Sequence, residues 1–471
     1  MLAESWRSGL TVTTFVQLFE SLAGPDNRQS MKLPALRNSV VVLDEPQSLL
    51  LDWWKLVSRL VSMLTEQYGA TVIAMTATQP ELFEGATELV GDPDEYFQVV
   101  ERVTYELDVS IDRYIADRSG PKSYDDAANS LHESALAGES ALAICNTIDG
   151  ARELTERTSA RIEGTDVAKA YGEELTEVGD VTEVNATSVA DRVGAIDGEP
   201  LLHLSTRLRP ADRLTLIETA KELTERGAPL VAVSTQLVEA GVDISFDYVY
   251  RDLAPIDSIV QAAGRCNRSF ERERGRVTVW WLDAPGEQTK TPAEAVYNPG
   301  TALLPVAAAT LNSVRDGSGR LSETEVARTA VNQYYRRLHD EKDVGKQAFA
   351  GYVDEARADE LGRLSLIDQR RAADVFICRT DAERELAEQL REANRTYDFE
   401  MLGRLLNETK PLRVSVPYYR EESETADAIR DLPQLIDDEG LYELDVRQYE
   451  SYFDRTTGFT VPDSSIGHLF L

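Results

Sequence analysis

Two segments that lie far apart in the chain carry side chains suited to phosphoryl transfer. The first is an apolar run that ends in Asp44 and Glu45, with Gln47 two residues further on. The second contains Gln261, Arg265 and Arg268, whose i, i+4, i+7 spacing predicts one face of a helix. Hydrolysis of a nucleoside triphosphate needs a magnesium ion on the outer phosphates, a base that orients water, and cations that meet the transferred phosphoryl group. Together the two segments predict a site for ATP and Mg²⁺ shared by two lobes.

The first segment offers a role for each polar side chain. Asp44 and Glu45 are the candidate metal ligands; we expect Asp44 to hold Mg²⁺ through its water shell and Glu45 to activate the attacking water. Gln47 is placed to sense the second lobe. Thr76 and Thr78 follow the next apolar run, and their hydroxyls are candidates to bond the two acids. The alternative is a strand that ends in acids before a turn, with threonines that cap a helix.

A further polar segment belongs with the second lobe. Gly241 permits close backbone approach to a nucleotide, Asp243 can face that nucleotide, and Thr235 can bond a phosphate of a nucleic-acid strand. Small residues between Gln261 and Arg265 allow equally close approach. These features favour contact with phosphate over a solvated arginine face.

Several side chains just after apolar runs suit a track for nucleic acid. Hydroxyls, amides and arginines of this kind contact phosphates without reading sequence. The candidates, besides Thr235, are Thr13, Thr14, Asn146, Thr147, His203, Arg207 and Arg213. At each of them a helix cap or a turn is the alternative interpretation.

The composition excludes several classes of protein. A hydrophobic content of 42% indicates globular domains, and the chain has no apolar run of about 18 residues, so we expect no membrane span. The three cysteines lie far apart and match neither a zinc nor a disulfide pattern, which, with no secretory signal, predicts a cytoplasmic protein. The net charge is −33, and only nine of the 49 basic residues are lysine. Acids spread along the whole chain favour adaptation to high salt over a cationic partner.

Short apolar runs alternate with helical patterns as far as about residue 283, which predicts parallel sheets covered by helices. The expected buried strands are Val40–Leu43, Thr71–Met75, Ala141–Cys145, Leu201–Leu204, Leu230–Val233 and Val277–Leu282. Ligands of such sheets bind at the carboxyl ends of the strands, where each motif lies.

The segments between and after these runs predict the remaining organisation. A polar stretch at Ser119–Asp126 would separate two lobes, the acidic stretch Tyr171–Pro200 would be a surface insertion, and Ala284–Gly300 would be a linker. Ser322 and Glu325 form a candidate capping box that opens a helix through Leu338. Strands are expected at Arg413–Val416 and Leu441–Val446.

On these residues the chain resembles a superfamily 2 helicase, and more closely the CRISPR-associated helicase-nuclease of type I interference systems. The most specific strings are Thr235–Asp243 and Gly264–Arg268; the others are Thr11–Phe19, Leu43–Gln47, Thr76–Thr78, Leu201–His203 with Arg207, and Asp212–Arg213. The resemblance covers residues 1 to about 350. It implies an α/β fold with two RecA-like lobes, the first incomplete, at 1–115 and 116–285, then a helical linker at 286–365 and a small α+β domain at 366–471.

The resemblance also implies a function. It is ATP-driven 3′-to-5′ movement on single-stranded DNA, recruited by a guide-RNA surveillance complex. However, the family's Gly-x-x-x-x-Gly-Lys-Thr loop is absent, since neither Gly120–Ser123 nor Gly345–Gln347 has the spacing. Four histidines are also too few for the family's nuclease domain.

These departures predict a chain that begins in the middle of the first lobe, as a truncated or split form would, and that is inactive alone. A separate polypeptide is the candidate source of the missing loop and nuclease domain. One alternative is a catalytically silent fragment, either a relic or a nucleic-acid-binding subunit. Another is a general DNA or RNA helicase of the same superfamily.

Overall fold

The computed structural model describes residues 6, 8–24, 31–76, 78, 82–83, 85–91, 101–239, 241–298, 302–316, 319–342, 344–364, 371–418, 423–436 and 440–462. The chain divides into two compact units. Unit 1 comprises Met1–Glu101, Pro255–Val260 and Gly300–Gln369; unit 2 comprises Arg102–Ala254, Gln261–Pro299 and Arg370–Leu471. The first break between the units falls between Glu101 and Arg102. The expected linker is divided between the units, and the expected C-terminal domain groups with the second lobe.

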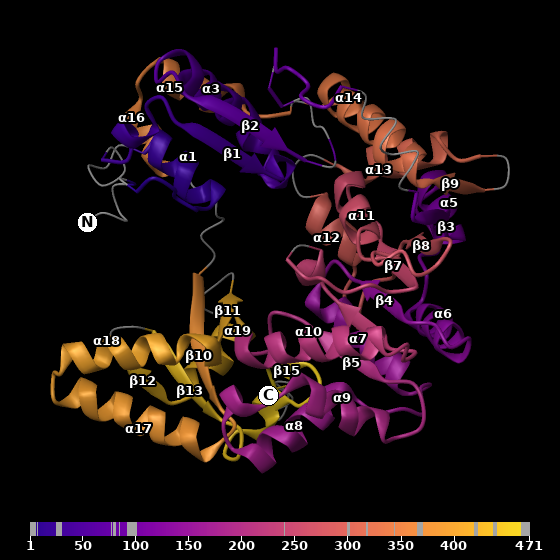
Figure 1. The fold of residues 1–471 in the computed structure, drawn as a ribbon, viewed down its shortest axis with the longest axis vertical. Helices are drawn as coiled ribbons and strands as arrows, with labels where there is room; N and C mark the ends of the chain where they lie inside the picture. The colour runs from indigo at the N-terminus through magenta and orange to yellow at the C-terminus, as the bar shows by residue number, and fades with distance from the viewer. Residues whose placement is uncertain are drawn as a thin grey trace, which may run out of the picture. The chain divides into compact units, whose positions relative to one another are not determined.

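Unit 1 is built around a parallel pair of strands, β1 and β2, as expected from their apolar runs. Its elements are α1 (Phe15–Ala23), β1 (Val40–Asp44), α3 (Trp54–Glu66), β2 (Thr71–Met75), α13 (Leu304–Ser313), β9 (Arg320–Ser322), a π-helical turn (Glu325–Ala330), α14 (Val331–Glu341), α15 (Gln347–Asp354) and α16 (Ala358–Arg363). Helix α3 buries Leu56, Leu60 and Leu64 on one face. Figure 1 shows α3 and α15 beside the β1–β2 pair.

The later part of unit 1 packs directly on α3. The ring centroids of Trp54 and Tyr335 lie 5.6 Å apart, and the Lys346 amide donates to the Asp52 carbonyl at 2.9 Å. Gly345 has a φ of +74°, and a Cβ there would lie 2.7 Å from the Lys55 backbone nitrogen. This glycine therefore serves close packing. The capping box is confirmed, because Ser322 and Glu325 exchange side chain-to-backbone hydrogen bonds at 2.8 and 3.1 Å.

The prediction that β1 is a buried strand is wrong for one of its faces. Val40 is 66% exposed and Val42 53% exposed, although Leu43 on the opposite face is buried. Met75 of β2 is also exposed. The reason is that a strand pair needs cover on both faces, and the described part of unit 1 supplies it on one. An open apolar face of this kind marks a surface that a further chain segment is suited to cover.

We predict that the open sheet makes the first hundred residues the least stable part of the chain. Limited proteolysis at a constant potassium chloride concentration should cleave within residues 1–101 first and leave a resistant core starting near residue 102, because unit 2 has a much larger sheet and core. Mass spectrometry of the fragments provides the measurement. Equal resistance of both units would show that the β1–β2 face is covered in solution.

Unit 2 contains an all-parallel sheet in the order β5-β6-β4-β7-β8-β3. The strands are β3 (Val103–Leu107), β4 (Ala141–Ile144), β5 (Leu201–Leu204), β6 (Val231–Ser234), β7 (Tyr248–Asp252) and β8 (Gly275–Trp280). Four of these match the expected runs within two residues, while β3 and β7 are additional. Because all strands run in parallel, the residues after β4, β5 and β6 share one edge of the sheet.

Helices cover this sheet. They are α5 (Val109–Ala116), α6 (Tyr124–Leu136), α7 (Ile148–Ser159), α8 (Val167–Val178), α9 (Ala186–Gly194), α10 (Pro210–Glu225) and α12 (Pro292–Tyr297). Helix α11 (Ile256–Ala263) follows β7 and is divided between the two units after Val260. The expected surface insertion at 171–200 is wrong: α8 and α9 bury Tyr171, Leu175 and Val189. Their small and β-branched residues pack tightly, and this burial is invisible in a count of large apolar residues.

The C-terminal part of unit 2 is a small α+β module, as predicted. Its sheet has the order β11-β10-β13-β12, formed by β10 (Arg371–Cys378), β11 (Arg413–Tyr418), β12 (Gln434–Ile436) and β13 (Leu441–Asp445). The hairpin β14 (Phe453–Asp454) and β15 (Gly458–Phe459) follows, and the helices are α17 (Asp381–Arg395), α18 (Phe399–Glu408) and α19 (Glu424–Arg430). Figure 1 shows α17 and α18 running along β12 and β13. In the part of the chain that the structure describes, no helix combines the length and apolar character needed to cross a membrane.

Candidate functional site

The two acids at the end of β1 stand where a parallel sheet presents ligands. Asp44 is the last residue of β1 and is exposed, and Glu45 follows it with φ 55° and ψ 52°. A non-glycine residue in this left-handed region carries backbone strain of about 1 kcal/mol or more, which recurs at functional sites. The Glu45 amide donates to the Met75 carbonyl at 2.8 Å and so anchors the turn to β2.

Gln47 and Thr76 connect the acid pair to the end of β2. The Gln47 side-chain amide donates to the Glu45 carboxylate, and its carbonyl accepts from the Thr76 hydroxyl at 2.6 Å. The Thr78 amide donates to the Thr76 hydroxyl at 3.0 Å. The expected bond between threonine and the acids is therefore indirect, through Gln47, which is only 6% exposed. Ala77 lies outside the described residues. This chain of bonds fixes the orientation of Glu45.

The arginines of the second motif do not share a helical face, so that prediction is wrong. Helix α11 ends at Ala263, and Arg265 and Arg268 lie in the turns that follow Gln261. Gly264 is a poor helix former, and residue Asn267 adopts a φ of 46°, which no helix accommodates. The Asn267 amide instead donates to the Phe246 carbonyl at 2.8 Å.

The two arginines have different surroundings. Arg265 is 8% exposed and donates to the carbonyls of Glu239, at 2.9 Å, and Val242. Arg268 is exposed, and its Nε lies 2.6 Å from Asp243 Oδ1. An exposed ion pair of this type contributes about 0–1 kcal/mol, so a phosphate can displace Asp243 at little cost. Arg265 therefore braces the segment before Asp243, and Arg268 is the cation that is accessible to a ligand.

The nucleotide candidates around Asp243 lie on an exposed turn. Gly241 has a φ of +72°, a backbone conformation that strains other residues, and is exposed. Gln261 is half-buried on α11. Thr235, a candidate contact for nucleic acid, follows β6 and is 6% exposed. In unit 2 the structure thus brings Gly241, Asp243 and Arg268 together at one surface.

Four of the candidate nucleic-acid contacts flank helices. Thr14 and Thr147 are N-caps, accepting from the amides of Gln17 at 3.2 Å and Gly150 at 3.1 Å, which is the alternative role foreseen for them. Thr13 is exposed, and Asn146 is buried. Both caps leave the hydroxyl proton free to donate to a phosphate. Asn146 has no such freedom, because its side chain bonds protein groups on both sides.

His203 is fully buried inside β5, so it is neither an exposed contact nor the cap or turn residue that was the alternative interpretation. Its Nδ1 lies 2.9 Å from the Thr155 hydroxyl, which itself donates to the Ala151 carbonyl at 2.7 Å. Since that hydroxyl has a single proton, Nδ1 carries the imidazole proton and donates it to Thr155. Burial, reinforced by Arg152, lowers the pKa of His203 to about 3.

The buried imidazole predicts a specific pH dependence of stability. Between pH 6.5 and 3 the unfolded chain binds a proton at His203 that the folded chain does not bind, so stability that is complete above pH 6.5 is lost as the pH falls. The loss reaches about 1.4 kcal/mol per pH unit. In urea unfolding, the free energy of unfolding of His203→Gln should decline less steeply with falling pH than that of the parent over this range. Thr155→Val removes the hydrogen bond alone and should keep the parent's slope, whereas equal slopes for parent and His203→Gln would mean that the imidazole is accessible to water.

Arg207 lies under the C-terminal hairpin. Its guanidinium stacks on the Phe459 ring at 5.7 Å, and its carbonyl accepts from the Phe459 amide at 2.9 Å. A Cβ on Gly458, where φ is +82°, would lie 2.3 Å from that carbonyl, so only glycine fits here. Burial lowers the pKa of Arg207 to about 10. Its Nη1 is buried with no hydrogen-bond partner among the described residues.

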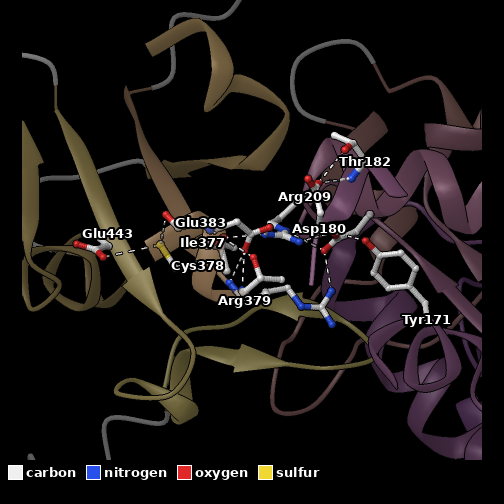
Figure 2. A network of polar contacts seen from close by, with 11 residues as sticks. Tyr171, Asp180, Thr182, Arg209, Ile377, Cys378, Arg379, Glu383 and Glu443 are labelled. Carbon is white, nitrogen blue, oxygen red and sulfur yellow. Dashed lines mark hydrogen bonds and ion pairs between the residues drawn. The ribbon is translucent and has the colours of Figure 1, made fainter. Parts of the chain in front are cut away.

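A buried network joins the start of α10 to the C-terminal module (Figure 2). Arg209 is fully buried and donates to Asp212 at 2.6 and 2.9 Å, to Glu383 at 2.7 Å and to the Ile377 carbonyl at 2.9 Å. Arg379 adds a bond to Asp212 at 2.8 Å. Burial alone would raise the pKa of Asp212, but the two arginines lower it on balance. Arg213 beside this network is half-buried. The network fixes the motif after β5 to β10.

The sequence interpretation missed the polar residues of β7. Arg251 and Asp252 are both fully buried, and they contact Asn146 and Glu239. Two charges at the end of an apolar run, before Pro255, are the same signal that marked Asp44 and Glu45. The run at Tyr248–Tyr250 was too short to be recognised.

The carboxylates of the described residues include no metal-binding cluster. No group of three or more His, Cys, Asp or Glu among them is arranged to hold a metal ion. Asp44 and Glu45 are a pair, which suits Mg²⁺, an ion usually held by one or two carboxylates together with substrate phosphates.

Comparisons with known proteins give a consistent picture. The family described as CRISPR-associated nuclease/helicase Cas3, C-terminal, matches residues 175–271. The chain is 37% identical to the CRISPR-associated nuclease/helicase Cas3 of Haloferax volcanii, over 88% of this chain and 51% of that protein. It is 29% identical to the Cas3 endonuclease/helicase of Thermus thermophilus, over 52% of this chain and 29% of that protein.

Solved structures show the same fold. The T. fusca Cas3 structure with ADP matches with a TM-score of 0.57 and 14% identity, covering 92% of this chain and 54% of that chain. A chain of a CRISPR RNA-guided surveillance complex matches with a TM-score of 0.51 and 15% identity, covering 94% of this chain and 58% of that chain. The α/β architecture of two RecA-like lobes is confirmed. The chain belongs to the CRISPR-associated Cas3 nuclease/helicase family, and it spans about half the length of the relatives it matches most fully.

Proposed function

We propose that this chain is the helicase part of a Cas3 protein, which couples ATP hydrolysis to movement along single-stranded DNA in CRISPR interference. The observation that carries the proposal is the order and placement of the motifs. Acids stand at the carboxyl end of β1, and an exposed arginine stands beside Asp243 in a second α/β unit. The Cas3 relatives, and the ATP- and ADP-bound Cas3 structures that share the fold, support the same proposal.

The described residues fit a nucleotide and its Mg²⁺. Asp44 would hold the ion, Glu45 would orient the attacking water, and Gln47 keeps Glu45 in place. Arg268 would meet the terminal phosphate, with Gly241 and Asp243 near the nucleotide. Mg²⁺, when bound, neutralises charge on the outer phosphates. What the sequence lacks is a glycine-rich loop with lysine to cradle those phosphates.

The open face of β1–β2 suits the missing loop. In a RecA-like lobe a loop of this type connects a strand to a helix, and both elements would cover exposed apolar surface such as Val40 and Val42. We propose that polypeptide outside these 471 residues supplies them. A separate chain that also carries the nuclease domain is one source, and the surveillance complex is the partner that would recruit the assembly to DNA.

Fewer residues are proposed to contact DNA directly than the sequence offered as candidates. Thr13, Thr14 and Thr147 present hydroxyls at exposed or half-buried positions, and Arg207 holds an unsatisfied donor. Asn146, His203 and Thr235 are buried, so they would act by holding the neighbouring backbone. Contacts of this kind bind the phosphate backbone of any sequence.

The proposal is tested by nucleotide hydrolysis. We predict that the chain alone releases phosphate from ATP at background rate, with or without an oligo-dT strand. Fusion to the part of the Haloferax volcanii relative outside its matched region should restore DNA-stimulated hydrolysis. Glu45→Gln should then abolish hydrolysis, because it removes the base while keeping the side-chain size. A fusion that binds DNA but never hydrolyses ATP would instead favour a silent nucleic-acid-binding subunit.

A further inference from the structure

Arg251 is a fully buried arginine whose side chain touches three separate parts of unit 2. Its Nε lies 2.8 Å from Glu239 Oε1. Its Nη1 donates to the Asn146 side-chain carbonyl at 2.6 Å and to the Asp252 backbone carbonyl at 2.8 Å, and its Nη2 donates to the Tyr297 hydroxyl at 3.2 Å. One side chain therefore binds the turn after β4, the segment after β6 and helix α12.

The two segments are joined by a second set of bonds around the same centre. Asn146 Nδ2 donates to Asp252 Oδ2 at 2.7 Å and to the Leu253 carbonyl at 2.9 Å. Gln236 Nε2 donates to the Asn146 backbone carbonyl at 3.3 Å and to the Tyr297 hydroxyl at 3.2 Å. The side chain of Asn146 is thus fully used inside the protein, and displacement of one segment breaks bonds to the other.

The chemistry of arginine suits this bridge. Burial alone would lower the pKa of Arg251, but Glu239 and the neighbouring acid and hydroxyl raise it on balance, so the guanidinium keeps its charge. Its planar fork reaches several acceptors at once, which an ammonium group cannot do in the same geometry. A buried ion pair adds little net stability compared with apolar side chains of similar volume, so stability alone does not explain the group.

We propose that Arg251 is a positioning residue that couples Asn146–Thr147 to Gln236–Glu239, so that ordering of one segment orders the other. The inference rests on the proposed function, in which Thr147 faces DNA and Asp243, just beyond Glu239, faces the nucleotide. Arg265 continues the connection, since it donates to the Glu239 carbonyl at 2.9 Å. Ordering of Asn146–Thr147 by DNA would thereby also order the segment around Asp243, which pairs with Arg268.

Hydrogen–deuterium exchange of the full chain, with and without oligo-dT, tests the coupling. In the parent, DNA should slow exchange in peptides covering both Asn146–Thr147 and Gln236–Glu239. The test variant is Arg251→Met combined with Glu239→Gln, which removes the guanidinium together with the Glu239 carboxylate that it pairs with, while Asp252 keeps its hydrogen bonds from Asn146 and from the Leu253 and Leu282 amides. In the absence of DNA both segments should exchange about fivefold faster or more in this variant, while β4 and β6 stay protected. With DNA, protection should then stop at Asn146–Thr147.

Three outcomes would overturn the coupling. In the first, DNA slows exchange of the parent only in Asn146–Thr147. In the second, DNA still slows exchange of the variant in Gln236–Glu239. In the third, the variant without DNA exchanges faster over the whole sheet. Arg226→Met, which removes a surface ion pair with Asp191, is the matched control and should leave both segments unchanged. If DNA protects neither segment of the parent, the DNA-contact proposal fails separately. The exchange rates of the variant without DNA then test the coupling by themselves: faster exchange in both segments supports it, and unchanged rates contradict it.

Discussion

Arg268→Ala should lower the rate of DNA-stimulated ATP hydrolysis about 10³-fold in the fused protein described above, because an arginine that meets the transferred phosphoryl group typically contributes that much or more. The KM for ATP should change much less, since the charge on this group develops in the transition state. Arg268 is exposed and paired only with Asp243 in the part of unit 2 that the structure describes. It can therefore leave that partner for a phosphate.

Arg272→Ala is the matched control for Arg268→Ala. Arg272 lies four residues further along and pairs with Glu139 and Asp247, which lie just before β4 and β7, rather than with Asp243. Its loss should alter hydrolysis less than about twofold, as expected for a surface ion pair. Steady-state phosphate release measures both variants. A loss below about tenfold for Arg268→Ala would mean that another cation meets the phosphate, with Arg265 as the next candidate.

Arg209→Met should destabilise unit 2 by about 3–5 kcal/mol, since it leaves Asp212 and Glu383 in the interior without the guanidinium that binds both. The methionine fills most of the space, so the loss reports the charges and hydrogen bonds. Figure 2 shows this arginine directed toward Glu383 and the Ile377 carbonyl of the C-terminal module. Detachment of that module should accompany the loss of stability.

Urea unfolding at several potassium chloride concentrations measures the effect of Arg209→Met. A buried network is screened little by salt, so the loss should persist at 1 M, where the Debye length is about 3 Å. Arg404→Met is the control, because Arg404 lies 3.8 Å from Glu408 on the surface of α18 and should contribute about 0–1 kcal/mol. A loss below about 1 kcal/mol for Arg209→Met would show that water reaches the network in solution.

The sequence alone determined the strands that carry the motifs and the order of those motifs. Thr71–Met75 and Leu201–Leu204 were predicted with the bounds that the structure has, because a short apolar run flanked by polar turns is a local signal. The Ser322–Glu325 capping box was equally local, since both partners lie within one turn. The family resemblance rested on strings of this local kind.

Only the tertiary structure decided which of the candidate side chains are exposed and which are buried. The i, i+4, i+7 spacing placed Arg265 and Arg268 on one helical face, but the helix ends at Ala263, and Arg265 and Asn267 form backbone hydrogen bonds with Phe246 in the segment before β7. His203 and Asn146 follow the same sequence logic as Thr147, yet neighbouring elements bury them. Arg251 escaped notice because its partners, Glu239 and Asn146, come together only when the sheet forms. Local sequence patterns indicate where helices, strands and turns form. The exposure of a side chain and its bonding partners depend instead on which distant residues pack against it.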